Sequence, residues 1–247
     1  MTIKLFVPKS YDELTDRQAR WLFRALVNNP DMNSVEFKLF AFIRFSGIRV
    51  ITRYHDTGEF LIKSGKTIFR IDPEQVAVAT RHLDWILFPP KNPWRTHRLA
   101  GRKTRDARLY DLPFGDWLAI DNLYQGYLRT EDPALLVNIA DILLPRLRLP
   151  LRRWELQVIL RWIVSVKEFY TRRFRHFFSG EGDANALGSA SPSSRQIEDA
   201  MNAQIRALTK GDIAKEQEIL AMPTLRALVE LDAQAKEYQD LKAKTKK

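Results

Sequence analysis

The sequence predicts an α+β protein with a mainly helical body, a small three-stranded antiparallel meander and a helical C-terminal module. Apolar residues recur at helical spacing over most of the 247 residues, and the spacing changes to strand alternation between residues 48 and 71. Residues 179–194 are rich in glycine and serine, a composition typical of a flexible linker. The expected domains are therefore 1–178 and 195–247, separated by this linker.

Two helices are expected before the meander. Ser10 and Glu13 have the spacing of a capping box, which predicts a helix that begins there and ends before Pro30. A second helix, over residues 33–45, is apolar nearly all round and is expected to be buried.

The meander is predicted from alternation and turn residues. Residues 48–54 alternate as a strand does, and Gly58 and Gly65 mark the two turns. The two following strands are expected over 59–63 and 66–71.

The remaining helices are read from caps and apolar stripes. Asp72 followed by Pro73 is a helix start. Further helices are expected over 113–128, 133–144 and 151–178, and then in three stretches after the linker, interrupted at Gly211 and at Met222-Pro223. The clearest stripe comprises Leu151, Trp154, Val158, Trp162, Val166, Phe169 and Tyr170. Residues 88–112 show no periodicity, and long irregular stretches of this kind are usually functional or mobile.

Several functional classes have no support in the sequence. There is no cysteine, which excludes disulfides, thiolate metal sites and a cysteine nucleophile. The four histidines are far apart, and no Gly-x-Ser-x-Gly or phosphate-binding glycine loop is present. We therefore expect no enzyme, metal or cofactor. No apolar run has the length of a signal peptide or membrane span, so the protein is expected to stay in the cytosol where it is made.

The net charge of +10 is concentrated in two segments, and one of them is a candidate site. Residues 91–108 hold seven basic residues and one acid. Contact with a polyanion such as nucleic acid would fall to Arg98, Arg102, Lys103, Arg105 and Arg108, with Trp94 and Tyr110 available for stacking. The alternative is an exposed loop that keeps the protein soluble or meets an acidic partner. The lack of a nucleic-acid-binding fold signature favours this alternative.

A second candidate site lies in the last helix. Leu228, Leu231, Ala235 and Tyr238 repeat at three-then-four spacing, like a short coiled-coil face. An isolated helix of this length is marginal in water, so the face is expected either to fold back on the body or to bind a partner protein or a second copy of the chain.

Three segments resemble proteins encoded in the tail-assembly region of temperate phages, near the tape-measure gene. They are Gln204–Lys242, Tyr11–Gln18 and Asp121–Leu128. The resemblance implies a tail assembly chaperone or a minor virion component that binds other tail proteins, the tape-measure protein among them. It carries over no catalytic residue and implies no small-molecule substrate.

Overall fold

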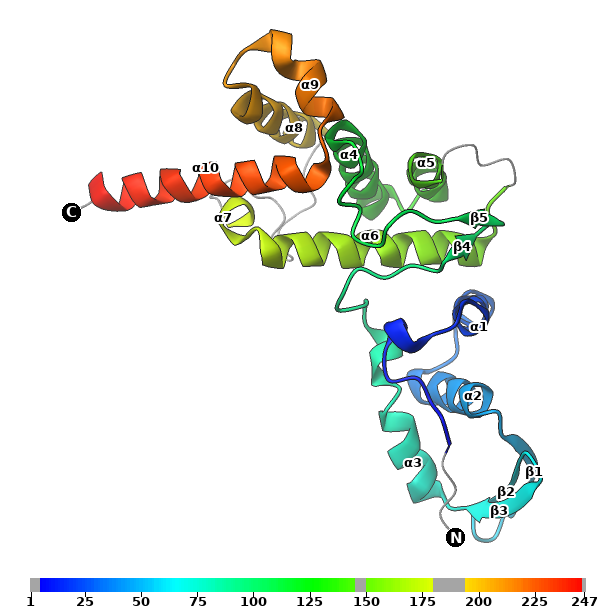
Figure 1. The fold of residues 1–247 in the computed structure, drawn as a ribbon. Coiled ribbons are helices and arrows are strands. Elements are labelled where there is room, and N and C mark those ends of the chain that lie inside the picture. The colour runs from blue at the N-terminus through cyan, green and yellow to red at the C-terminus, as the bar shows by residue number, and fades with distance from the viewer. Residues whose placement is uncertain (1–4, 145–149, 180–193, 246–247) are drawn as a thin grey trace. The chain divides into compact units, whose positions relative to one another are not determined.

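The computed structural model describes residues 5–144, 150–179 and 194–245 (Figure 1). The chain is 64% helical and contains a three-stranded antiparallel sheet and a small two-stranded sheet, which confirms the α+β prediction. Contacts within the chain divide it into two units, residues 1–90 and 91–247. This division differs from the predicted domains 1–178 and 195–247. Residues 180–193 of the predicted linker lie outside the described residues.

The first unit opens with a 3-10 turn, η1 (Tyr11–Glu13), and helix α1 (Asp16–Asn28). The capping box predicted at Ser10 is wrong, since Ser10 makes no side-chain capping bond. Thr15 caps α1 instead: its hydroxyl accepts from the Gln18 amide, and the Gln18 side chain accepts from the Thr15 amide. Both places satisfy the Ser/Thr-x-x-Glu/Gln pattern, so the pattern alone could not choose between them.

Helix α2 (Ser34–Ser46) lies where the sequence predicts a helix, but only one of its faces is buried: Val35 is 66% exposed and Phe40 is 56% exposed. The Asn33 side chain accepts hydrogen bonds from two amides of its first turn, and Gly47 ends it with a φ of 68°, which glycine adopts without strain. Its buried side chains are Phe37, Ala41, Phe42 and Phe45.

The predicted meander is present, in the strand order β1-β2-β3. The strands are β1 (Arg49–Arg53), β2 (Phe60–Ser64) and β3 (Thr67–Ile71). Ile62, in the central strand, is buried, whereas every residue of the edge strand β1 is exposed. The sheet therefore has one face on the core, as expected for an antiparallel meander.

Helix α3 (Pro73–Arg81) begins where the Asp72-Pro73 pair predicted, with the Asp72 carboxylate accepting from the third amide of the helix. A 3-10 turn, η2 (Asp84–Leu87), follows. The Tyr11 hydroxyl donates to the Ile86 carbonyl oxygen at 3.1 Å, which joins the two ends of this unit.

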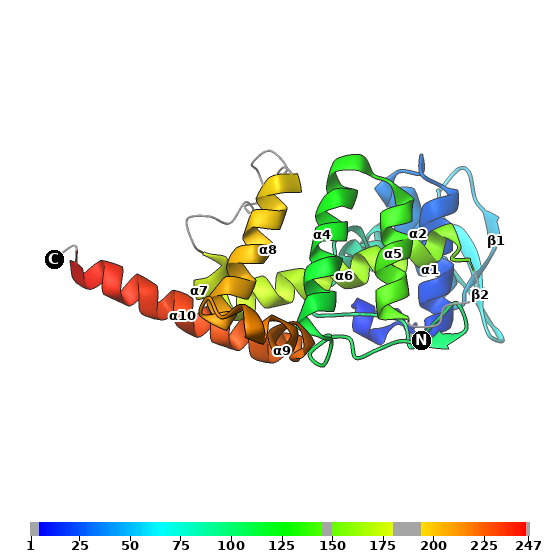
Figure 2. The same cartoon turned by 90° about the horizontal axis from the view of Figure 1, so that it is seen from above.

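The second unit is built on three helices. They are α4 (Phe114–Thr130), α5 (Pro133–Leu143) and α6 (Arg153–Arg173). Helices α4 and α5 pack against each other, and α5 packs on α6 (Figures 1 and 2). The helix predicted to continue to residue 178 is broken at the buried Phe174, whose backbone is not helical, and a short helix α7 (Arg175–Phe178) follows.

The C-terminal helices are α8 (Ser194–Thr209), α9 (Glu216–Ala221), which follows the turn η3 (Ile213–Lys215), and α10 (Thr224–Thr245). They pack on the second unit: α8 and α9 contact α4, and α10 contacts α7. The Phe114 amide donates to the Met222 carbonyl oxygen at 2.8 Å, and the Phe177 amide donates to the Asp232 carboxylate at 3.0 Å. These helices therefore belong to the second of the two units.

Candidate functional site

The basic segment, residues 91–108, is held against α6 by hydrogen bonds to its backbone. Four side chains of α6 make these bonds. Glu155 accepts from the Ala100 amide (3.1 Å), Ser165 accepts from the Trp94 amide (3.1 Å), Trp162 donates to the Ala107 carbonyl (2.8 Å), and Tyr170 donates to the Arg108 carbonyl (2.6 Å). A segment without periodicity is thus ordered by a helix that begins some fifty residues later, because its buried backbone groups need partners.

Within this segment the chain forms a small hairpin, β4 (Arg98–Leu99) and β5 (Arg102–Lys103). The two turn residues, Ala100 and Gly101, have φ values of 45° and 77°, as a type I′ turn requires. Leu99 is buried, and the amide of Ala100 is bound by the buried carboxylate of Glu155. The hairpin is therefore fixed on α6 at its turn.

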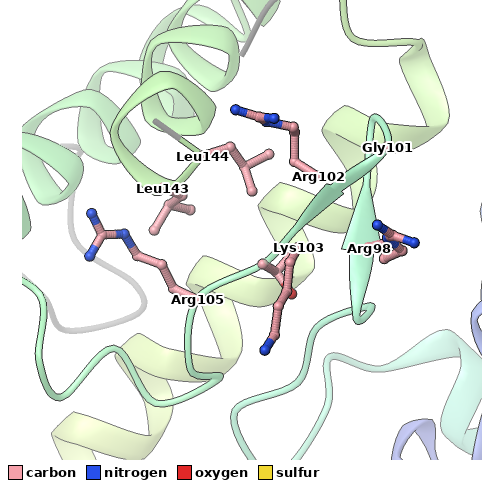
Figure 3. A pocket seen from close by; sticks show the side chains of 8 residues that line it. Arg98, Gly101, Arg102, Lys103, Arg105, Leu143 and Leu144 are labelled. Atoms are coloured by element: carbon pink, nitrogen blue, oxygen red, sulfur yellow. The ribbon is translucent and has the colours of Figure 1, made fainter. Parts of the chain in front are cut away.

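A pocket of about 420 Å³ lies beside this hairpin (Figure 3). Its lining residues are Arg98, Gly101, Arg102, Lys103, Thr104, Arg105, Leu143 and Leu144. In Figure 3 the guanidinium groups of Arg102 and Arg105 lie on either side of the two leucines at the end of α5, and Lys103 and Arg98 extend away from the leucines. Four of the five predicted polyanion contacts thus border one pocket.

The fifth candidate, Arg108, lies elsewhere. Its guanidinium carbon is 5.7 Å from the ring centre of Tyr110 and 5.9 Å from that of Phe169. Arg173 approaches the same Tyr110 ring at 5.8 Å. Arg108 therefore belongs to a cluster of aromatic and arginine side chains toward the end of α6, not to the hairpin pocket.

The two rings that the sequence offered for base stacking are engaged inside the fold. Trp94 is buried. Tyr110 stacks on Tyr170, with ring centres 6.3 Å apart and planes 8° apart, and is flanked by Arg108 and Arg173. The prediction that these rings stack on nucleic-acid bases therefore has no support in this arrangement.

The solvent exposure of the predicted partner-binding face increases along α10. Leu228 and Leu231 are 0% and 4% exposed, and Ala235 is half-buried. Tyr238 is 66% exposed, as is its neighbour on the next turn, Leu241, at 63%. The first half of the face, at Leu228 and Leu231, packs back on the body, which is one of the two alternatives that the sequence left open. The second half is exposed where α10 extends past α7 and α8 (Figures 1 and 2).

Two other classes of site are absent from residues 5–144, 150–179 and 194–245. No group of three or more histidine, aspartate and glutamate side chains converges as metal ligands would. No helix there combines the length and apolar character needed to cross a bilayer.

The roles of Glu155, Leu143 and Leu144 were not predicted from the sequence. The Glu155 side chain, which binds the turn of the hairpin, is buried and also accepts from the Arg152 amide at 2.8 Å. Leu143 and Leu144, which line the pocket, fall at the end of the helix expected over residues 133–144. Neither role has a local signal, because each depends on which distant segment lies against the helix.

Comparisons with protein-family models, with curated proteins and with solved structures found no match to this chain.

Proposed function

We propose that this chain is a non-enzymatic protein of phage tail assembly that binds a helical segment of another tail protein along the exposed end of α10. The observation that carries the proposal is the continuity of one apolar face. The face is buried at Leu228 and Leu231 and stays apolar at the exposed Tyr238, and the exposed Leu241 lies beside it one turn further along the helix.

The position of this face agrees with the resemblance noted in the sequence. The segment Gln204–Lys242, which resembles phage tail-assembly proteins, ends within the exposed part of α10. In such proteins the expected partner is the tape-measure protein or another tail component.

The chemistry of the exposed end fits a partner helix. Tyr238 and Leu241 supply two apolar anchors one turn apart, as helix pairing requires. Lys236, Glu237 and Asp240, all exposed, place both signs of charge beside these anchors. A partner helix with mixed charges at its flanks would complement them.

Co-expression with a tape-measure protein encoded in the same genome tests the proposal. A tagged full-length chain should retain the tape-measure protein, and the double substitution Tyr238→Asp with Leu241→Asp should weaken retention at least about tenfold, because a charge would face an apolar contact. Both residues are exposed, so the melting temperature should stay nearly unchanged.

Val229→Asp is the matched control. Val229 is 51% exposed on the same helix, and it lies nine residues before Tyr238, on the opposite side. Retention by this variant and loss by the double variant support the proposal. Equal retention by both contradicts it. If the purified chain sediments as a dimer that the double variant dissociates, the face serves self-association instead.

A further inference from the structure

The charged lining of the hairpin pocket is entirely cationic among the described residues. Arg98, Arg102, Lys103 and Arg105 border it, and no aspartate or glutamate does. The described residues show no ion pair from Arg102, Lys103 or Arg105 to an acidic side chain. Placing like charges side by side without a counter-charge costs free energy, which a bound anion would recover.

We propose that this pocket binds the phosphodiester backbone of a nucleic acid, with Arg102 and Arg105 contacting phosphate oxygens and Arg98 and Lys103 extending the cationic surface. The inference does not depend on the function proposed for α10, because it concerns a different surface and a different class of ligand.

The side chain of Arg105 is partly buried at the pocket. Its Nε is buried and has no hydrogen-bond partner in the part of the chain that the structure describes. The guanidinium is therefore partly desolvated at Nε. A phosphate on its terminal nitrogens would form charge-assisted bonds in surroundings where such bonds are strong.

The end of α5 does not supply the missing negative charge. Leu143 is the last residue of α5, so the C-terminal end of the helix dipole lies at the pocket. That end is equivalent to about half an elementary charge, whereas Arg102, Lys103 and Arg105 bring three full positive charges to the pocket. The dipole offsets only a small part of the excess.

The distribution of the cations favours a polymer over a single small anion. Arg102 and Arg105 flank the leucines, and Arg98 and Lys103 extend away from them (Figure 3). Such a spread suits the closely spaced phosphates of a nucleic-acid backbone. Since Trp94 and Tyr110 are engaged in the fold, binding is expected to be independent of sequence and to need no unstacked bases.

Fluorescence anisotropy with a short labelled duplex and the corresponding single strand tests the inference on the full chain. Each phosphate contact contributes about −0.9 to the slope of log K against log salt, so four contacts predict roughly a 100-fold loss between about 50 and 200 mM salt. Arg102→Gln with Arg105→Gln should weaken binding at low salt and reduce the slope by about two.

Two further variants separate binding from folding and from net charge. Arg102→Gln alone leaves the partly buried Arg105 in place and should still reduce the slope by about one. Arg226→Gln with Lys236→Gln removes the same charge from exposed positions on α10 and should leave the slope unchanged.

The inference is overturned if the α10 control weakens binding as much as the pocket variant, or if the chain binds neither probe. Two competitors, inorganic phosphate and polyglutamate, are then added at constant ionic strength to identify the class of anion that the pocket binds. Displacement of the duplex by inorganic phosphate would assign the pocket to a free anion. Equal, Arg102-dependent binding of polyglutamate would assign it to an acidic polypeptide.

Discussion

The Thr224 hydroxyl donates a hydrogen bond to the Leu112 carbonyl oxygen at 2.7 Å, and the Thr224 amide donates to the same oxygen at 2.8 Å. Thr224 is the first residue of α10, and Leu112 lies just before α4. Both residues are fully buried. This pair joins the C-terminal helices to the rest of the second unit, although 112 residues separate the two positions.

Replacing the hydroxyl should weaken that junction. Thr224→Val keeps the shape of the side chain and leaves the amide bond, so the expected loss is about 1 kcal/mol in the free energy of unfolding. Urea denaturation measures it. Thr245→Val is the control, because the exposed Thr245 hydroxyl donates only to the carbonyl one turn earlier in its own helix. Equal effects of the two variants would contradict the role assigned to Thr224.

Glu155 should hold the β4–β5 hairpin in its observed position on α6. Glu155→Gln replaces a carboxylate that accepts from two amides, those of Ala100 and Arg152, by an amide with a single acceptor oxygen. We expect a stability loss of roughly 1–3 kcal/mol, since a buried donor loses its charged partner. Amide exchange at Ala100 should accelerate as well. Glu218→Gln, at an exposed position of α9, should change neither quantity.

The elements that the sequence predicted well are those with local signals. Asp72 and Asp132 each precede a proline and cap their helices through their own side chains, and Gly47 ends α2. Such interactions span only a few residues, so they can be recognised in the sequence. The β4–β5 hairpin was missed because each strand has two residues, too few for alternation to appear.

The candidate sites depended on contacts that periodicity does not encode. Helical spacing placed Trp162 and Tyr170 on a buried stripe, but it could not show that both side chains also donate to carbonyls near the basic segment. The α10 face is uniformly apolar in sequence, so nothing local distinguishes Leu231, which the body covers, from Tyr238, which it does not.

Tyrosine ionisation should limit stability at alkaline pH. Burial, and next the negative charge of Asp121, raise the pKa of Tyr124 from 10.0 to about 12. Burial also raises the pKa of Tyr170, whose hydroxyl donates to the Arg108 carbonyl. The folded state therefore holds these phenol protons more tightly than the unfolded state does. The stability this contributes is complete below pH 10 and is lost as the pH rises through the folded pKa.

The variant Tyr124→Phe isolates one of these groups. Between about pH 10 and 12, the midpoint of urea denaturation should fall less steeply in this variant than in the wild-type chain. Tyr238→Phe is the control, because it removes the same hydroxyl group from an exposed ring. Identical profiles for wild type and Tyr124→Phe would show that Tyr124 ionises equally in both states.

The two halves of the α10 face should respond differently to the same change. Leu231 is 4% exposed and packs inside the second unit, whereas Leu241, ten residues later on the same helix, is 63% exposed. Leu231→Ala removes buried methyl groups and leaves a cavity, with an expected cost of about 2–5 kcal/mol in the free energy of unfolding. Leu241→Ala makes the same chemical change at a position already in water, where surface substitutions usually fall within about 0.5 kcal/mol. Because alanine favours the helix slightly over leucine, propensity adds almost nothing to either value. Urea denaturation of both variants measures the difference directly.

A large loss of stability for Leu231→Ala and none for Leu241→Ala would leave Leu241 available for a partner. Equal losses would mean that α10 is covered along its whole length in solution, and the exposed end could then not serve as the docking face proposed for it.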